Sequence, residues 1–114
     1  MGSVLRIELE QLEHRIILRI EGRIDAASAP ILERKIESLI GEEHHILIFD
    51  FTRVDYLSSA GMRVLLSAAR KLKAKKGDLI LFGISDDVAE ILKMAGFDKI
   101  LHIVSTEAQA LQAK

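Results

Sequence analysis

The feature that most constrains the fold of this sequence is a run of apolar residues near its middle, Ile46 to Phe51, interrupted only by Asp50. A strand with one exposed face alternates apolar and polar residues, whereas a strand covered on both faces is apolar almost throughout. The run therefore predicts the central strand of a sheet that is covered on both sides. Such a strand is typical of an α/β fold.

Strand-type and helix-type patterns alternate along the rest of the chain. Apolar and charged residues alternate over Val4–Glu10 and over Ile16–Glu21, which predicts two strands joined as a hairpin. Further strands are predicted at 79–82 and 100–104. Helices are predicted where apolar residues recur at helical spacing behind a capping hydroxyl, namely after Ser28, Ser59, Ser85 and Ser105 or Thr106. The last of these is expected to bury Ala108 and Leu111.

The predicted order is ββαβαβαβα, in a single domain over residues 1–114. Strands joined through helices run parallel with right-handed crossovers, so only the first strand of this mostly parallel sheet is expected to run antiparallel. Partners of such sheets usually meet loops at the carboxyl ends of the strands. Two loops qualify by content: Gly22–Ala29, with Gly22 ending the second strand, and Thr52–Gly61, which begins as a polar turn over Thr52–Leu57.

Composition excludes several classes of function. The 114 residues are 49% hydrophobic and 29% charged, as in a globular domain, and the net charge of -1 offers no field for nucleic acid or anionic membrane. Cysteine is absent, which excludes disulfides and thiolate catalysis and fits a reducing cytosol. No apolar run approaches the roughly 18 residues of a membrane-spanning helix. We therefore expect a cytoplasmic protein without membrane insertion, and its oligomeric state stays open.

Catalytic and metal-binding patterns are poorly matched. Ser59 lies between a strand and a helix, as a hydrolase nucleophile does, but Leu57 occupies the place of the glycine in that motif. His44 and His45 are adjacent and would point to opposite faces of a strand, which argues against a shared metal site. We expect no enzyme activity, no metal and no cofactor.

The most specific segment is Val54–Arg63, which places Ser58 and Ser59 at the junction between the central strand and the following helix. A phosphate there would meet unpaired backbone N–H groups and a helix dipole worth about 0.3 to 1 kcal/mol. It would also add a charge of roughly -1.5 to -2, enough to repel a partner that had met a neutral hydroxyl. The segment therefore predicts a binding switch. Either serine can cap the helix, so position alone leaves open which one carries the phosphate.

Two motifs make essentially the whole chain similar to the STAS domains, the family of sulfate transporters and anti-sigma-factor antagonists. Gly22–Ala29 looks like the family's glycine-x-apolar-aspartate loop. Tyr56–Gly61 resembles the phosphorylated motif of aromatic, apolar, aspartate, serine, serine or threonine, and glycine. The resemblance aligns the family's phosphorylated serine with Ser59. Ser58 stands where the family has aspartate, and Ala60 where it has serine or threonine.

The resemblance implies an anti-sigma-factor antagonist that regulates transcription by partner switching. Without phosphate it would bind an anti-sigma factor with serine kinase activity and free the sigma factor; phosphate on Ser59 would release it, and a serine phosphatase would reset it. The expected partner-binding residues are Asp25, Ser58, Gly61, Met62 and Arg63. The alternative is a STAS scaffold or accessory subunit of a signalling or transport complex, whose loop is never phosphorylated. Ser58 in place of aspartate favours this alternative.

Four charged residues near the two loops also have purely structural interpretations. Aspartate is a common turn former, so Asp25 is equally well explained as a residue that shapes its loop. Arg63 could help to dock a partner, although an exposed helical arginine is more often simply solvated. Asp50 and Asp55 are expected to end the central strand and to form turn hydrogen bonds.

Overall fold

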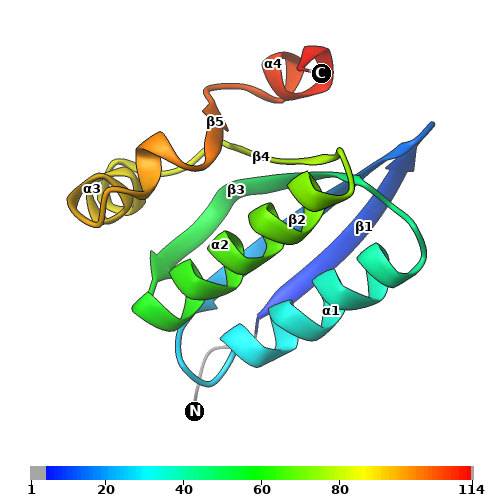
Figure 1. Cartoon of the computed structure of the whole chain (residues 1–114). Helices are drawn as coiled ribbons and strands as arrows, with labels where there is room; N and C mark the ends of the chain where they lie inside the picture. Colours follow the sequence, from blue (N-terminus) through cyan, green and yellow to red (C-terminus); the bar gives the residue numbers. More distant parts are fainter. Residues whose placement is uncertain (1–4, 114) are drawn as a thin grey trace.

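The computed structural model describes residues 5–113, and within them it shows one five-stranded sheet with helices on both faces (Figure 1). The predicted order of strands and helices is confirmed, with one short 3-10 helix added before the last strand. The elements are β1 (Arg6–Leu12), β2 (Arg15–Ile24), α1 (Ala29–Gly41), β3 (Ile46–Leu57), α2 (Ser59–Ala74), β4 (Asp78–Phe82), α3 (Asp86–Met94), η1 (Phe97–Lys99), β5 (His102–Val104) and α4 (Glu107–Gln112).

The strands lie in sequence order from β1 to β5. β1 pairs antiparallel with β2, and each later strand pairs parallel with the one before it. This arrangement confirms the predicted mostly parallel sheet with one antiparallel N-terminal strand. The predicted first strand included Val4, which lies outside the described residues.

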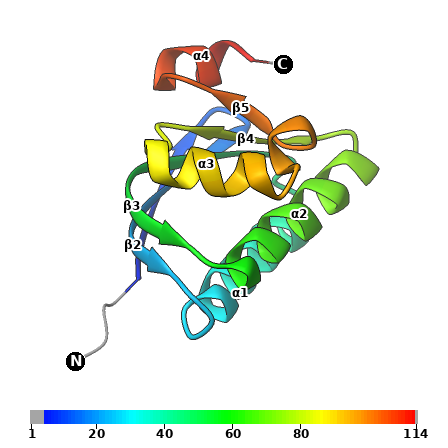
Figure 2. The same ribbon diagram turned by 90° about the vertical axis from the view of Figure 1, so that its left-hand side faces the viewer.

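The central apolar run is buried on both faces, as predicted. Leu47 and Phe49 of β3 belong to the larger core, which the strands share with α1, α2 and α3. Ile48 faces the other way, into a smaller core that contains Ala110 of α4. Figure 2 shows α4 separated from α1 and α2 by the strands. Ala110 is the fully buried alanine of α4, whereas Ala108 is exposed, so that the predicted burial of Ala108 is wrong.

The predicted end of β2 at Gly22 and the predicted turn over Thr52–Leu57 are wrong, because both strands continue beyond these points. β2 runs past Gly22, and β3 runs through the segment predicted as a polar turn, until Ile24 pairs with Leu57. Two irregularities in the pairing each add one residue to β3, so that its buried residues Phe51, Val54 and Leu57 come at intervals of three. That spacing hides the period of two by which strands are recognised.

The extended ends form a two-stranded projection, which we call the β2–β3 arm: Gly22–Ile24 paired with Val54–Leu57. β4 does not accompany it, because the last residue of β4, Phe82, pairs with Asp50. Gly22 has a positive φ of 120°, a conformation that favours glycine, at the second irregularity. The arm carries both candidate loops beyond the edge of the main sheet.

Asp50 does not end a strand as predicted but lies buried within β3. Its Oδ2 accepts a hydrogen bond of 2.8 Å from Nη1 of Arg19, and its Oδ1 accepts bonds from the backbone N–H and the hydroxyl of Thr52. Arg19 also donates to Glu107 of α4 and to Glu10 of β1, each at 2.9 Å. One guanidinium group therefore ties α4 to three strands. Burial raises the pKa of Asp50, but the hydrogen bonds from Thr52 and Arg19 outweigh burial and hold the pKa below its ordinary value.

The ion pair predicts how acid acts on the protein. A carboxylate whose pKa is lowered by folding stabilises the fold above its ordinary pKa of 3.8, and this contribution is lost as the pH falls through the lower folded-state pKa. We expect Asp50→Asn to lower the free energy of unfolding at neutral pH by about 1 to 2 kcal/mol. The variant should then lose less stability on acidification than the unmodified protein.

Urea denaturation at two pH values, one neutral and one below the ordinary carboxyl pKa of 3.8, measures the loss of stability at neutral pH and the further loss in acid. Asp55→Asn removes an exposed carboxylate from the same strand and is the matched control, with an expected change within about 0.5 kcal/mol. Equal losses of stability in acid for Asp50→Asn and the unmodified protein would contradict the assignment.

Candidate functional site

The tip of the β2–β3 arm holds the two candidate loops side by side. Ile24 and Leu57 are paired as the last residues of their strands. The backbone N–H of Ser58 donates to the carbonyl of Ile24 at 2.8 Å, which joins the start of α2 to the loop that leads into α1. Gly22–Ala29 and Thr52–Gly61 therefore form one surface.

Ser58 is the N-cap residue of α2. Its backbone is extended, and its Oγ accepts a hydrogen bond of 3.1 Å from the N–H of Gly61. Its carbonyl accepts from the N–H of Met62 at 2.9 Å, the first main-chain bond of the helix. The hydroxyl of Ser58 is thus turned into the helix end and half-buried.

Ser59 is the first residue of α2, and it is exposed. Neither its N–H nor that of Ala60 forms a hydrogen bond to any residue that the structure describes. An outward hydroxyl therefore stands beside two backbone donors at the positive end of a helix dipole, an arrangement that suits an anionic group. The geometry separates the two serines: Ser58 caps the helix and Ser59 faces solvent.

Asp25 organises the neighbouring loop. Its Oδ1 accepts hydrogen bonds from the N–H groups of Ala27 and Ser28, at 3.0 and 2.9 Å. The Oγ of Ser28 in turn accepts from the N–H of Asp25 and donates to the carbonyl of Arg23. The hydrogen bonds from Ser28 lower the pKa of Asp25, so the carboxylate stays charged. These contacts match the turn-forming interpretation of Asp25.

Ser28 is the N-cap residue of α1, as predicted, but its side chain does not cap the helix. The backbone of Ser28 is already helical, with φ -93° and ψ -20°, and its hydroxyl makes no capping hydrogen bond. A side chain caps a helix from an extended backbone, as that of Ser58 does. Asp25 instead satisfies N–H groups in the turn ahead of α1.

The remaining predicted partner-binding residues differ in exposure. Gly61 is buried, and a Cβ on it would lie 2.6 Å from Cγ2 of Ile24 and 2.7 Å from Cδ1 of Leu57. Packing against these two side chains is sufficient to explain why residue 61 is a glycine. Met62 is half-buried against the larger core, and Arg63 is exposed.

A shallow hollow of about 330 Å³ lies between the first turns of α1 and α2. Ala26 and Glu33 line it from the side of α1, and Ala60 and Arg63 line it from the side of α2. The hollow extends the surface around Ser59 towards α1. A partner that covers Ser59 could therefore also contact this hollow.

Arg23 and Tyr56 are residues for which no role beyond their motifs was predicted. The guanidinium carbon of Arg23 lies 4.3 Å from the centre of the Tyr56 ring, a cation–π contact across the β2–β3 arm. The two side chains meet because β2 and β3 continue past Gly22 and Thr52, which pairs Arg23 with Tyr56.

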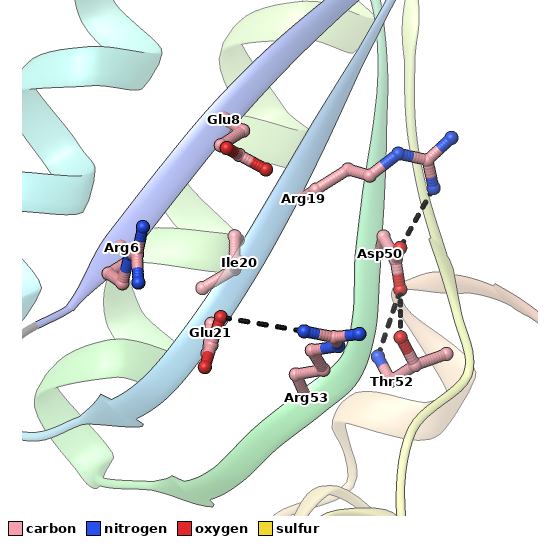
Figure 3. A pocket seen from close by; sticks show the side chains of 8 residues that line it. All are labelled: Arg6, Glu8, Arg19, Ile20, Glu21, Asp50, Thr52 and Arg53. Carbon is pink, nitrogen blue, oxygen red and sulfur yellow. Dashed lines mark hydrogen bonds and ion pairs between the residues drawn. The ribbon is translucent and has the colours of Figure 1, made fainter.

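A larger hollow, of about 460 Å³, lies on another part of the sheet and is lined by residues of β1, β2 and β3 (Figure 3). Charges of opposite sign alternate across these strands in two rows, Arg6–Glu21–Arg53 and Glu8–Arg19–Asp50. Every buried side-chain polar atom among the described residues has a hydrogen-bond partner, so that no orphaned group points into the hollow. The charges stabilise the sheet through cross-strand pairs, and they do not build a ligand site.

Neither a metal site nor a membrane span is found among residues 5–113. These residues contain no group of three or more His, Cys, Asp and Glu side chains that could hold a metal ion. No helix in the same part of the chain is long and apolar enough to cross a membrane.

The different roles of the two serines can be tested on the unmodified protein. Ser58→Ala removes a cap and should lower the free energy of unfolding by about 1 kcal/mol. Ser59→Ala removes an exposed hydroxyl without a partner and should change it by less than about 0.5 kcal/mol. Chemical denaturation of both variants measures the difference, and a larger loss for Ser59→Ala would reverse the assignment.

Comparison with known proteins agrees with the fold. The family model of the STAS domain matches residues 6–110. The anti-sigma-B factor antagonist of Listeria monocytogenes is 29% identical over 109 residues, which cover 96% of this chain and 95% of the relative.

Two solved structures share the fold. An anti-sigma factor antagonist from Mycobacterium paratuberculosis superposes with a TM-score of 0.88 at 22% identity, over 97% of this chain and 96% of that one. The phosphorylated form of the Bacillus cell fate determinant SpoIIAA superposes with a TM-score of 0.72 at 23% identity, over 93% and 96%. The match over residues 6–110 means that this chain belongs to the STAS domain family.

Proposed function

We propose that this protein is an anti-sigma-factor antagonist that works by partner switching. Without phosphate it binds an anti-sigma factor that is also a serine kinase, and phosphate on Ser59 releases it. The observation that carries the proposal is the exposed hydroxyl of Ser59 beside the free N–H groups of Ser59 and Ala60. A relative that covers 96% of the chain is itself an anti-sigma-B factor antagonist.

Ser59 is a better phosphate acceptor than Ser58 for a geometric reason. A kinase must reach the hydroxyl, and Ser59 is exposed whereas Ser58 is half-buried. The Oγ of Ser58 is also occupied as the acceptor for the N–H of Gly61.

The departure from the family motif at Ser58 is chemically small. Aspartate and serine cap helices about equally well, because each offers an oxygen to the N–H groups of the first turn. Ser58 makes this bond to Gly61, so that it fills the role of a capping aspartate. An uncharged cap also spares a phosphate on Ser59 the repulsion of an adjacent carboxylate.

The partner is expected to contact the surface formed by Asp25, Met62 and Arg63 around Ser59. A phosphate in the centre of this surface adds a charge of roughly -1.5 to -2, which must be desolvated or repelled when the partner docks. The helix itself tolerates this charge, because its N-terminus favours anions. In this proposal the protein is the substrate of a kinase and of a serine phosphatase, and it is not itself an enzyme. It acts in the cytoplasm.

The direct test is phosphorylation by the kinase partner. Incubation of the purified protein with ATP and an anti-sigma-factor kinase from the same organism should add one phosphate, which mass spectrometry should locate on Ser59. Ser59→Ala should abolish the modification. Ser58→Ala should retain it, because the acceptor hydroxyl is still present.

Modification of Ser58 instead would overturn the assignment of the acceptor. A stable complex with this kinase and no modification at all would overturn the switch. That result would favour the alternative, a STAS scaffold or accessory subunit whose loop is never phosphorylated.

A further inference from the structure

Arg63 has no structural role in the unphosphorylated protein, although it lies one helical turn after Ser59. α2 buries the face that includes Val64, Leu65 and Ala68, while Ser59 and Arg63 are both exposed. Among the residues that the structure describes, Arg63 forms no hydrogen bond and no ion pair. A charged side chain is thus held next to the proposed phosphate acceptor without a partner of its own.

We propose that Arg63 is the intramolecular counterion of a phosphate on Ser59, and that its capture by the phosphate withdraws a free cation from the docking surface. This inference rests on the proposed function, because it requires phosphate on Ser59. It assigns Arg63 a second role, which begins when Ser59 is phosphorylated.

The helix geometry brings the two groups within reach. Residues four positions apart on a helix are neighbours, with Cβ atoms about 5 to 6 Å apart. Helical side chains lean towards the N-terminus of their helix, so that Arg63 leans back over the turn that begins with Ser59. A guanidinium group can then donate two parallel hydrogen bonds to phosphate oxygens. The free N–H groups of Ser59 and Ala60 complete the set of donors.

Two carboxylates near Ser59 could compete with the phosphate for the guanidinium group of Arg63. Glu33 of α1 lines the same hollow as Arg63. Asp25 follows Ile24, whose carbonyl accepts the hydrogen bond from the N–H of Ser58. One oxygen of Asp25 is already occupied by the N–H groups of Ala27 and Ser28. A phosphate with roughly twice the charge of Glu33 attracts Arg63 more strongly than that carboxylate does.

Phosphorylation would then change the docking surface in two ways at once. It would place negative charge at the helix end, and it would hold Arg63 against that charge and away from α1. A partner that had used Arg63 as a cation would lose this contact as well as the neutral hydroxyl.

The test uses the full chain with phosphoserine incorporated at position 59 during translation, so that it does not depend on a kinase. Phosphorus NMR gives the second pKa of the phosphate, which is about 6 for free phosphoserine. A cation next to the phosphate favours the dianion and lowers this pKa. Arg63→Gln should therefore raise it, by about 0.3 unit or more.

Arg70→Gln is the matched control, because Arg70 is an exposed arginine farther along the same helix, beyond the reach of Ser59. It should leave the phosphate pKa unchanged, and Arg63→Lys should keep part of the effect of arginine. At about 1 M salt, where screening acts within about 3 Å, the difference between Arg63→Gln and the unmodified chain should shrink.

Equal phosphate pKa values for Arg63→Gln, Arg70→Gln and the unmodified chain would overturn the role of Arg63. This failure is distinct from failure of the proposed function, because the phosphate is installed without the partner. A kinase that leaves Ser59 unmodified would overturn the proposed function whatever the NMR titration shows.

Discussion

The structure around the proposed phosphate acceptor depends on one contact, the hydrogen bond from the N–H of Ser58 to the carbonyl of Ile24 at the tip of the β2–β3 arm. This bond fixes the start of α2 against the end of β2 and brings the two loops onto one surface. It is supported by the close packing of Gly61 on Ile24 and Leu57, which leaves no room for a Cβ. The arm itself has only one sheet neighbour per strand at its tip, so that these contacts must hold the site in place.

The proposed phosphorylation site must keep the helix intact while it changes the surface, and the two adjacent serines divide these tasks. Ser58 supplies the capping oxygen, and Ser59 supplies a hydroxyl that stabilises nothing in the described part of the chain. The added charge meets a favourable helix dipole worth about 0.3 to 1 kcal/mol, so that the fold is not strained by it. On the proposed docking surface, the same charge opposes binding, because the partner would have to repel or desolvate it.

The central strand, the order of the elements and the cap at Ser85 could be predicted from the sequence, because they rest on local patterns. The extension of β3 could not, because the extra residues in the arm place Phe51, Val54 and Leu57 at intervals of three. The ion pairs of Arg19 join residues 9, 31 and 88 positions away, so that no window of sequence contains them. At the site, the sequence placed both serines at the helix start, but only the backbone conformation separated their roles.

The measurement that tests this account most directly is the affinity of the purified protein for the proposed anti-sigma-factor kinase, with and without phosphate on Ser59. Isothermal titration should give a defined complex for the unphosphorylated chain. With the phosphate in place, the affinity should fall by about a hundredfold or more, equivalent to about 3 kcal/mol of repulsion and desolvation. Equal affinities for the two forms would contradict the claim that Ser59 lies at the centre of the docking surface.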